Sequence, residues 1–160
     1  MSSKDSKAPA IPGSFVFAAG ADRFTLPRTK ELELELTRIV IQTDAAPKSP
    51  AYSQAIKSNG LVFVSGQGPF DARTGEVVGT TIEAQTAQCL RNVKAILEAA
   101  GSSLDKAVSA TFILAEESDF AGMNEEWRKW FPKDPPARQG ARLPIRPKGM
   151  KVSIAMVAEA

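Results

Sequence analysis

Histidine is absent from this chain of 160 residues. Histidine is the usual side chain for proton transfer near neutral pH and the commonest protein ligand of transition metals. Its absence excludes Ser-His-Asp and Cys-His catalytic groups and argues against a zinc site. Any chemistry must therefore come from Arg, Lys, Tyr, Ser, carboxylates, backbone groups or bound water.

Cysteine, net charge and long apolar runs are also scarce. The single cysteine, Cys89, excludes an intrachain disulfide and fits a reducing compartment, which favours the cytoplasm. The net charge is +2, from 20 basic and 18 acidic residues, so we expect no nucleic-acid partner. No apolar run approaches the roughly 20 residues of a membrane span, so we expect no membrane association.

The composition indicates one globular domain with a single core, since 43% of the residues are hydrophobic. Residues 1–37 mix Pro, Gly, Ser and charge, and we interpret them as a flexible N-terminal extension. The alternative is a mitochondrial targeting segment, against which the acidic residues Asp5 and Asp22 argue. The domain is then predicted to occupy residues 38–160.

The hydrophobic pattern of this domain predicts the order β-β-β-α-β-α-β-β. Strands are expected in the second half of 31–43 and over 105–115, 137–144 and 150–158, and a hairpin with an Asn59-Gly60 turn is expected in 51–66. Helices are expected over 81–101 and 118–131. The second helix should begin at an N-cap, Ser118, and have Phe120 on its apolar side. Two helices on one face of a mixed sheet form an α+β fold. The other face needs cover, so we expect a symmetric homo-oligomer.

Arg138 opens a predicted strand in "PPARQGARLP" and is the first candidate for a ligand. A planar guanidinium can hold a carboxylate through two parallel hydrogen bonds, which a lysine cannot do. By chemistry alone Arg142 and Arg146 are equally eligible, and an arginine with a purely structural role is the simpler interpretation.

Two further stretches contain residues that packing alone does not require. Tyr52 is the only tyrosine, and Ser65 and Gly66 end an apolar strand in "VFVSGQGPF", where backbone N–H groups can line a pocket. An ordinary strand aromatic and a plain turn are the alternatives for these positions. Cys89 lies on the apolar stripe of the first helix, which favours packing over nucleophilic chemistry.

Six stretches together resemble the Rid family, the reactive intermediate deaminases also called YjgF, and are most similar to its RidA branch. They are "APKSPAYSQAI", "LVFVSGQGPFDARTGEVVG", "QTAQCLRNVKAILEAAG", "DFAGMNEEWRKWF", "PPARQGARLP" and "KGMKVSIAMVA". The resemblance runs in order from about Arg38 to Ala158. It implies a chorismate-mutase-like fold, a homotrimer with pockets between subunits, and no cofactor.

Active members of this family hydrolyse 2-imino acids, such as 2-iminopropionate and 2-iminobutyrate, to 2-keto acids and ammonia. The resemblance assigns the carboxylate-binding arginine to Arg138 and the pocket tyrosine to Tyr52. It places the strand-end Ser-Gly pair at Ser65 and Gly66 and the helix asparagine at Asn124. It thereby selects Arg138 from the three arginines that chemistry alone left open.

Two positions depart from the family pattern. Active members carry a glutamate on the last strand that orients the attacking water, and the corresponding residue here is Ser153, which lacks the basicity of a carboxylate. The cysteine often found two residues after the arginine is Gly140. The sequence therefore predicts a 2-iminobutanoate/2-iminopropanoate deaminase-like hydrolase, with Arg138, Tyr52 and Ser153 as its catalytic candidates. The alternatives are a protein that only binds small carboxylates, a hydrolase for a larger imine or enamine, and an endoribonuclease, which the composition does not support.

Overall fold

The computed structural model describes residues 38–143 and 149–160, so the predicted N-terminal extension lies outside the described residues. The strands are β1 (Ile39–Ile41), β2 (Ala55–Ser58), β3 (Leu61–Gln67), β4 (Ala107–Leu114), β5 (Ala137–Arg142) and β6 (Val152–Glu159). The α-helices are α1 (Ile82–Ala99) and α2 (Phe120–Trp130), and short 3-10 turns cover Leu104–Lys106 and Glu117–Asp119. The predicted order of elements is confirmed.

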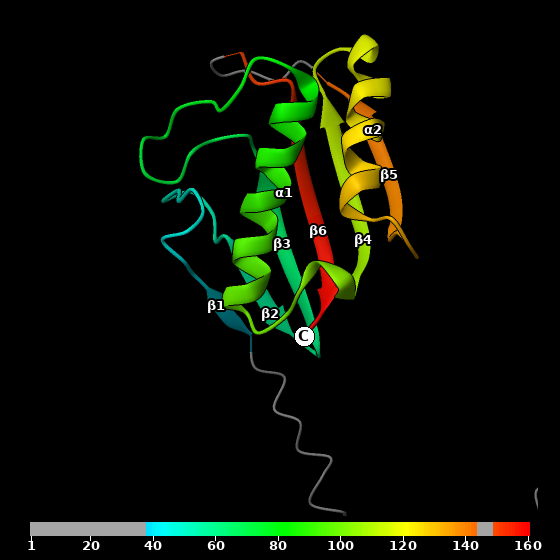
Figure 1. The fold of residues 1–160 in the computed structure, drawn as a ribbon. Coiled ribbons are helices and arrows are strands. Elements are labelled where there is room, and N and C mark those ends of the chain that lie inside the picture. Colours follow the sequence, from blue (N-terminus) through cyan, green and yellow to red (C-terminus); the bar gives the residue numbers. More distant parts are fainter. Residues whose placement is uncertain (1–37, 144–148) are drawn as a thin grey trace, which may run out of the picture. The chain divides into compact units, whose positions relative to one another are not determined.

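The strands form one mixed sheet in the order β1-β2-β3-β6-β4-β5. Only the pair β4 and β5 is parallel, and all other neighbours are antiparallel. Figure 1 shows both helices in front of the same face of this sheet, with α1 beside β3 and β6 and α2 beside β4 and β5. The predicted α+β architecture, with two helices on one face, is therefore confirmed.

Local sequence explains the best-predicted elements. Asn59 and Gly60 both have positive φ, at 51° and 74°, which is the backbone that a two-residue hairpin turn requires. Helix α1 begins at Thr81, whose hydroxyl accepts a hydrogen bond from the Ala84 N–H at 3.2 Å. It stops before Gly101, which has a φ of 79°.

The core lies between α1 and the central strands β3 and β6. The apolar stripe of α1 includes Leu90 and Val93, and it packs against Ile154 and other buried residues of β6. Cys89 belongs to this core, where its Sγ lies 3.6 Å from the Val152 carbonyl oxygen. Burial raises the pKa of the Cys89 thiol, so the structural interpretation of this residue is confirmed.

Two details of helix α2 differ from the prediction. The N-cap is Asp119, and Ser118 lies inside the preceding 3-10 turn, because the chain begins to coil earlier than the sequence pattern indicated. The Asp119 carboxylate instead accepts hydrogen bonds from Lys151 Nζ at 3.2 Å. Phe120 was expected in the apolar stripe, but 47% of its surface is exposed; the buried positions of α2 are Met123 and Trp127.

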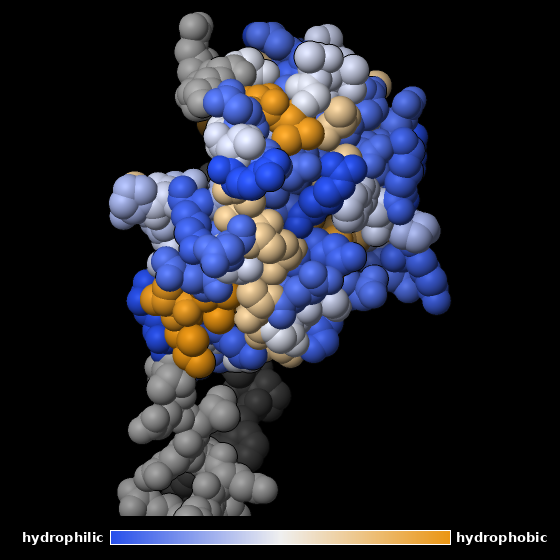
Figure 2. Space-filling model, turned by 60° about the vertical axis from the view of Figure 1, so that its left-hand side comes forward, coloured by the Kyte–Doolittle hydropathy of each residue, from blue (hydrophilic) through white to orange (hydrophobic). Residues whose placement is uncertain are grey.

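The face of the sheet opposite the helices is uncovered in the described chain. Phe63 of β3 points to this face, because its neighbours Val62 and Val64 are buried under the helices, and it is 45% exposed. Ile39 and Val40 of the edge strand β1 are each 48% exposed, and Figure 2 shows hydrophobic surface around the end of the molecule where β1 lies. No helix among the described residues is long and apolar enough to cross a membrane.

Candidate functional site

Arg138 is the second residue of β5, so it lies near the start of a strand as the sequence predicted, and β5 is at the edge of the sheet. It pairs in register with the buried Ala110 of β4, so its side chain lies on the face that the helices cover. Helix α2 packs over this edge and provides Met123, Asn124 and Trp127 around the guanidinium. A strand side chain that points under a helix has few accessible rotamers, so the position of the Arg138 guanidinium is restricted.

The guanidinium of Arg138 is held between two aromatic rings. Its Cζ lies 5.0 Å from the centroid of Phe112 and 4.9 Å from that of Trp127, both within cation–π range. Its Nη2 donates to Asn124 Oδ1 at 2.5 Å, and its Nη1 lies 3.7 Å from the sulfur of Met123. Asn124, which only the resemblance singled out, therefore contacts Arg138 directly.

These contacts leave Arg138 able to bind an anion. A guanidinium has five N–H groups, and within the described residues the two contacts of Arg138 involve one Nη1 and one Nη2 group. Partial burial lowers the pKa of Arg138, but a guanidinium remains charged in proteins. Arg138 and Asn124 also line a hollow of about 270 Å³ together with Trp127 and Pro136. This geometry suits a planar carboxylate.

A second group of candidates lies at the end of β3. Ser153 of β6 belongs to the uncovered face, because its neighbours Val152 and Ile154 are buried under α1. A Cβ placed on Gly66 would lie 3.0 Å from Ser153 Oγ, so the absence of a side chain at Gly66 gives Ser153 its space. Gly66 and Ser153 are therefore adjacent, although they are 87 residues apart in sequence.

Ser65, which precedes Gly66, is hydrogen-bonded to the residues that follow Tyr52. Its Oγ donates to the Ser53 carbonyl at 2.7 Å, and its N–H donates to the Gln54 carbonyl at 3.0 Å. The N–H of Ser65 is therefore used within the chain, and the ligand-binding role of Ser65 stays a prediction. Tyr52 precedes these anchored residues and is 52% exposed, so its hydroxyl is accessible.

Gln54 is a buried residue that sequence reasoning missed, and it holds the Tyr52 loop in place. Its Nε2 donates to the carbonyls of Thr43, Ala46 and Pro47 at 2.8–3.0 Å, and its Oε1 accepts from the Thr43 N–H at 2.7 Å. A glutamine directly before a strand gives no sequence signal for such a role. The loop conformation thus depends on a single side-chain amide.

Replacing Gln54 tests this dependence. We expect Gln54→Ala to lower the free energy of unfolding by about 2–4 kcal/mol, because several buried backbone groups lose their partner at about 1–3 kcal/mol each. Hydrogen exchange should increase in residues 43–52. The matched control is Gln42→Ala, at an exposed position beside the same loop, which should leave both measurements unchanged. Equal stability of the two variants in urea unfolding would contradict the role of Gln54.

The two groups do not meet within one chain. Ser153 pairs with Ile113 of β4, which pairs with Ala141 of β5, three residues beyond Arg138. With strands about 4.8 Å apart and a rise of about 3.3 Å per residue, the Cα atoms of Ser153 and Arg138 lie about 14 Å apart. Their side chains point to opposite faces of the sheet, because residues 138 and 141 differ by an odd number.

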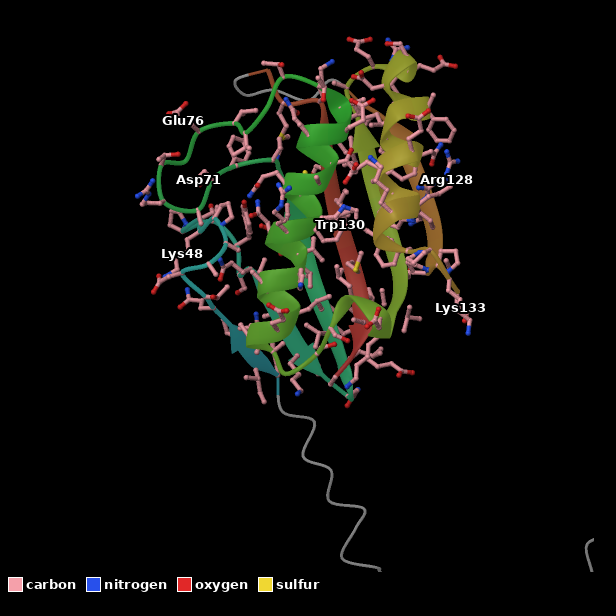
Figure 3. All side chains as sticks on the ribbon, in the orientation of Figure 1. Lys48, Asp71, Glu76, Arg128, Trp130 and Lys133 are labelled. Carbon is pink, nitrogen blue, oxygen red and sulfur yellow. The ribbon has the colours of Figure 1, made fainter. Side chains whose placement is uncertain are left out.

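Figure 3 shows labelled side chains on two opposite sides of the molecule. Lys48, on the loop that leads to Tyr52, lies on one side of the molecule together with Asp71 and Glu76. Arg128 of α2 and Lys133, which precedes β5, lie on the opposite side. Tyr52 comes shortly before β2, whereas Arg138 belongs to β5, at the other end of the strand order.

Phe112 and Trp127 are the residues around Arg138 that the sequence did not reveal as functional. Both read as core residues, because Phe112 alternates correctly in a strand and Trp127 lies on the apolar side of a helix. Among the described residues no cluster of acidic or cysteine side chains is arranged to hold a metal ion. The candidate groups in the described residues are thus the partly buried Arg138 and, separately, Ser153 beside Gly66.

Comparisons with known proteins identify a family model and relatives that match this chain. The model of the family described as Endoribonuclease L-PSP matches residues 43–160. A RutC family protein of Pyrococcus horikoshii is 44% identical over 120 residues, which are 74% of this chain and 95% of that protein. The chloroplastic Reactive Intermediate Deaminase A of Arabidopsis thaliana is 39% identical over 120 residues, 74% of this chain and 64% of that protein.

The fold has a solved counterpart at the same level of similarity. The crystal structure of RidA from an Antarctic Psychrobacter has a TM-score of 0.72 and 40% sequence identity, and the match covers 77% of this chain and all of that one. Family model, relatives and fold all agree with the resemblance that the six sequence stretches indicated. The chain therefore belongs to the Rid/YjgF family.

Proposed function

We propose that this protein hydrolyses reactive 2-imino acids, of the 2-iminopropionate and 2-iminobutyrate type, to 2-keto acids and ammonia. The observation that carries the proposal is the guanidinium of Arg138, fixed between Phe112 and Trp127 and hydrogen-bonded to Asn124. A carboxylate is the part that every 2-imino acid shares. A rigid guanidinium with free N–H donors binds it in a defined orientation.

The reaction needs only water besides the substrate. Arg138 holds the carboxylate, and the adjacent carbon of the protonated imine accepts the oxygen of a water molecule, which loses a proton. The nitrogen of the resulting carbinolamine takes up a proton, the C–N bond breaks with release of ammonia, and the hydroxyl proton is lost as the carbonyl forms. A protonated imine is already a strong electrophile, so orientation and a confined water supply much of the rate.

The complete site requires a second subunit. The Arg138 group and the Ser153 group lie on different faces of one chain, so an interface between subunits is the arrangement that brings them together. The uncovered sheet face, with the exposed ring of Phe63, supplies an apolar surface for such an interface. We accordingly propose a homotrimer in which Tyr52, Gly66 and Ser153 of one protomer face Arg138 of its neighbour.

A binding function is the second candidate, and Ser153 is the observation that favours it. Ser153 Oγ lies beside Gly66 where a carboxylate would serve as the base, and a serine hydroxyl is a poor base near neutral pH. In that case Arg138 would bind a small carboxylate metabolite without turning it over. Calorimetry with pyruvate, a stable product analogue, would then show binding in the absence of catalysis.

Imine decay in solution tests the proposed function. An amino-acid oxidase generates 2-iminopropionate from alanine in the presence of the full chain, and the imine is followed by its trapping with semicarbazide. We expect the protein to accelerate imine loss several-fold above the spontaneous rate and to yield pyruvate and ammonia in equal amounts. Imine decay at the rate of the protein-free control would contradict the hydrolase function. If calorimetry then showed pyruvate binding, the result would support the binding function.

A further inference from the structure

A cavity of about 480 Å³ opens beside the Arg138 site, and the proposed function does not yet use it. Its apolar walls come from β4, β5 and the start of α2, and Arg142 lies at its rim. The residues that form the apolar walls are Phe112, Leu114, Phe120, Ala121, Gly140 and Ala141. A hollow of this size with mostly apolar walls is typical of a ligand site rather than of a packing defect.

Phe112 links the cavity to Arg138. Its ring lies 5.0 Å from the Arg138 guanidinium, and the same ring lines the cavity. Gly140 pairs with Phe112 in register and is two residues from Arg138 on the same face of β5, about 7 Å along the strand. The ring of Phe112 therefore borders both the Arg138 guanidinium and the cavity.

Gly140, on the cavity wall, makes room for the ring of Phe112. A Cβ at this position would fall inside the ring of Phe112, so no other residue fits unless Phe112 moves. The ring of Phe112 thus occupies the space above residue 140, and the cavity continues past it toward α2. The ring of Phe112 thus forms part of the cavity wall, and the absence of a side chain at Gly140 gives this ring its space.

Phe120 supplies an accessible aromatic surface at the same place. Its ring centroid lies 6.0 Å from that of Phe112, and 47% of the residue is exposed although it opens a helix in the apolar register. Exposed aromatic rings around a hollow favour ligands with apolar or aromatic groups. The cavity therefore suits a bulky apolar group better than a methyl group.

We propose that this cavity receives the side chain of the imino acid, so that the enzyme prefers imines with bulky apolar side chains, such as those derived from phenylalanine or leucine. The proposal rests on the proposed function, because Arg138 must hold the carboxylate while the side chain enters the cavity. The side chain of phenylalanine reaches about 5 Å from its carboxylate carbon to its ring centre, given C–C bonds of about 1.5 Å. Phe112 and Phe120 would contact this ring.

Kinetics with two imines test the preference. We expect kcat/KM for the phenylalanine-derived imine to exceed that for the alanine-derived imine by about 10-fold or more, since a single methylene already changes selectivity about 10-fold or more in an apolar pocket. Ala121→Leu, at an exposed helical position on the cavity wall, should lower this ratio about 10-fold by filling the space. Ala99→Leu, at an exposed position of α1, is the matched control and should keep the wild-type ratio.

Binding of the stable 2-keto acids separates the two proposals. We expect phenylpyruvate to bind more tightly than pyruvate in calorimetry and Ala121→Leu to remove the difference. Selective binding without turnover of either imine would overturn the proposed function and support the cavity assignment. Turnover with equal kcat/KM for both imines, or a ratio that Ala121→Leu leaves unchanged, would overturn the cavity assignment and leave the deaminase function intact.

Discussion

Arg138→Ala is expected to lower kcat/KM for 2-iminopropionate by about 10²- to 10⁴-fold. Two hydrogen bonds to a charged group contribute about 1.5–3 kcal/mol each, and both are lost with the guanidinium. The variant should also lose calorimetric binding of pyruvate. Arg138→Lys keeps the charge but not the planar pair of donors, so we expect its activity to fall between those of the wild type and the alanine variant.

The control for Arg138 must separate chemistry from folding. Arg91→Ala removes an exposed arginine of α1 that donates to Gln88 Oε1 at 3.1 Å, and it should leave kcat/KM unchanged. The unfolding midpoint of Arg138→Ala has to be measured as well, because Phe112 and Trp127 lose the cation between them. Equal turnover in Arg138→Ala and wild type would contradict the assignment of Arg138 as the carboxylate-binding residue.

The elements of this fold that depend on local sequence were predictable. The Asn59-Gly60 turn follows from the positive φ that both residues adopt readily, and the hydrophobic stripe of α1 follows from its 3.6-residue period. The uncovered sheet face followed from counting two helices against one sheet. These features need no knowledge of which distant segments meet.

Features that depend on tertiary contacts were not predictable. Phe120 has the spacing of a core residue, yet it is 47% exposed and lines the cavity next to Phe112. The N-cap of α2 is Asp119 and not the predicted Ser118. The Asp119 carboxylate accepts a hydrogen bond from Lys151, which is 32 residues further along the sequence. Gln54 becomes a loop anchor only because the loop folds back over it.

The candidate site was predictable only in part, for the same reason. Side-chain chemistry alone made Arg138, Arg142 and Arg146 equal candidates for the carboxylate-binding residue. Only the family resemblance distinguished them. In the structure Arg142 is 63% exposed and lies 3.7 Å from the Glu116 carboxylate, whereas Arg138 is enclosed by α2; Arg146 lies outside the described residues. The aromatic rings around Arg138 and the cavity beside it arise from the pairing of β4 with β5, which no local pattern reveals.

Ser153→Glu is expected to raise kcat/KM for 2-iminopropionate by about 10²- to 10⁴-fold, the usual contribution of a general base. The side chain at 153 projects to the uncovered face beside Gly66, where the missing Cβ leaves space. The new carboxylate would accept a proton from the attacking water. An ordinary glutamate pKa is about 4.3, so the gain should be complete near neutral pH and disappear as the pH falls below that value.

Ser153→Gln is the matched control, because it has the size of the glutamate without its basicity. If basicity is the missing element, the glutamine variant should remain at the wild-type rate while the glutamate variant gains. An equal gain in both variants would assign the effect to pocket shape, and no gain in either would mean that orientation by Arg138 already sets the rate. Because Ser153 and Arg138 lie about 14 Å apart in one chain, any gain that also requires Arg138 must arise between subunits. Mixing Ser153→Glu/Arg138→Ala protomers with wild-type protomers tests this directly, since the gain should reappear only in mixed oligomers.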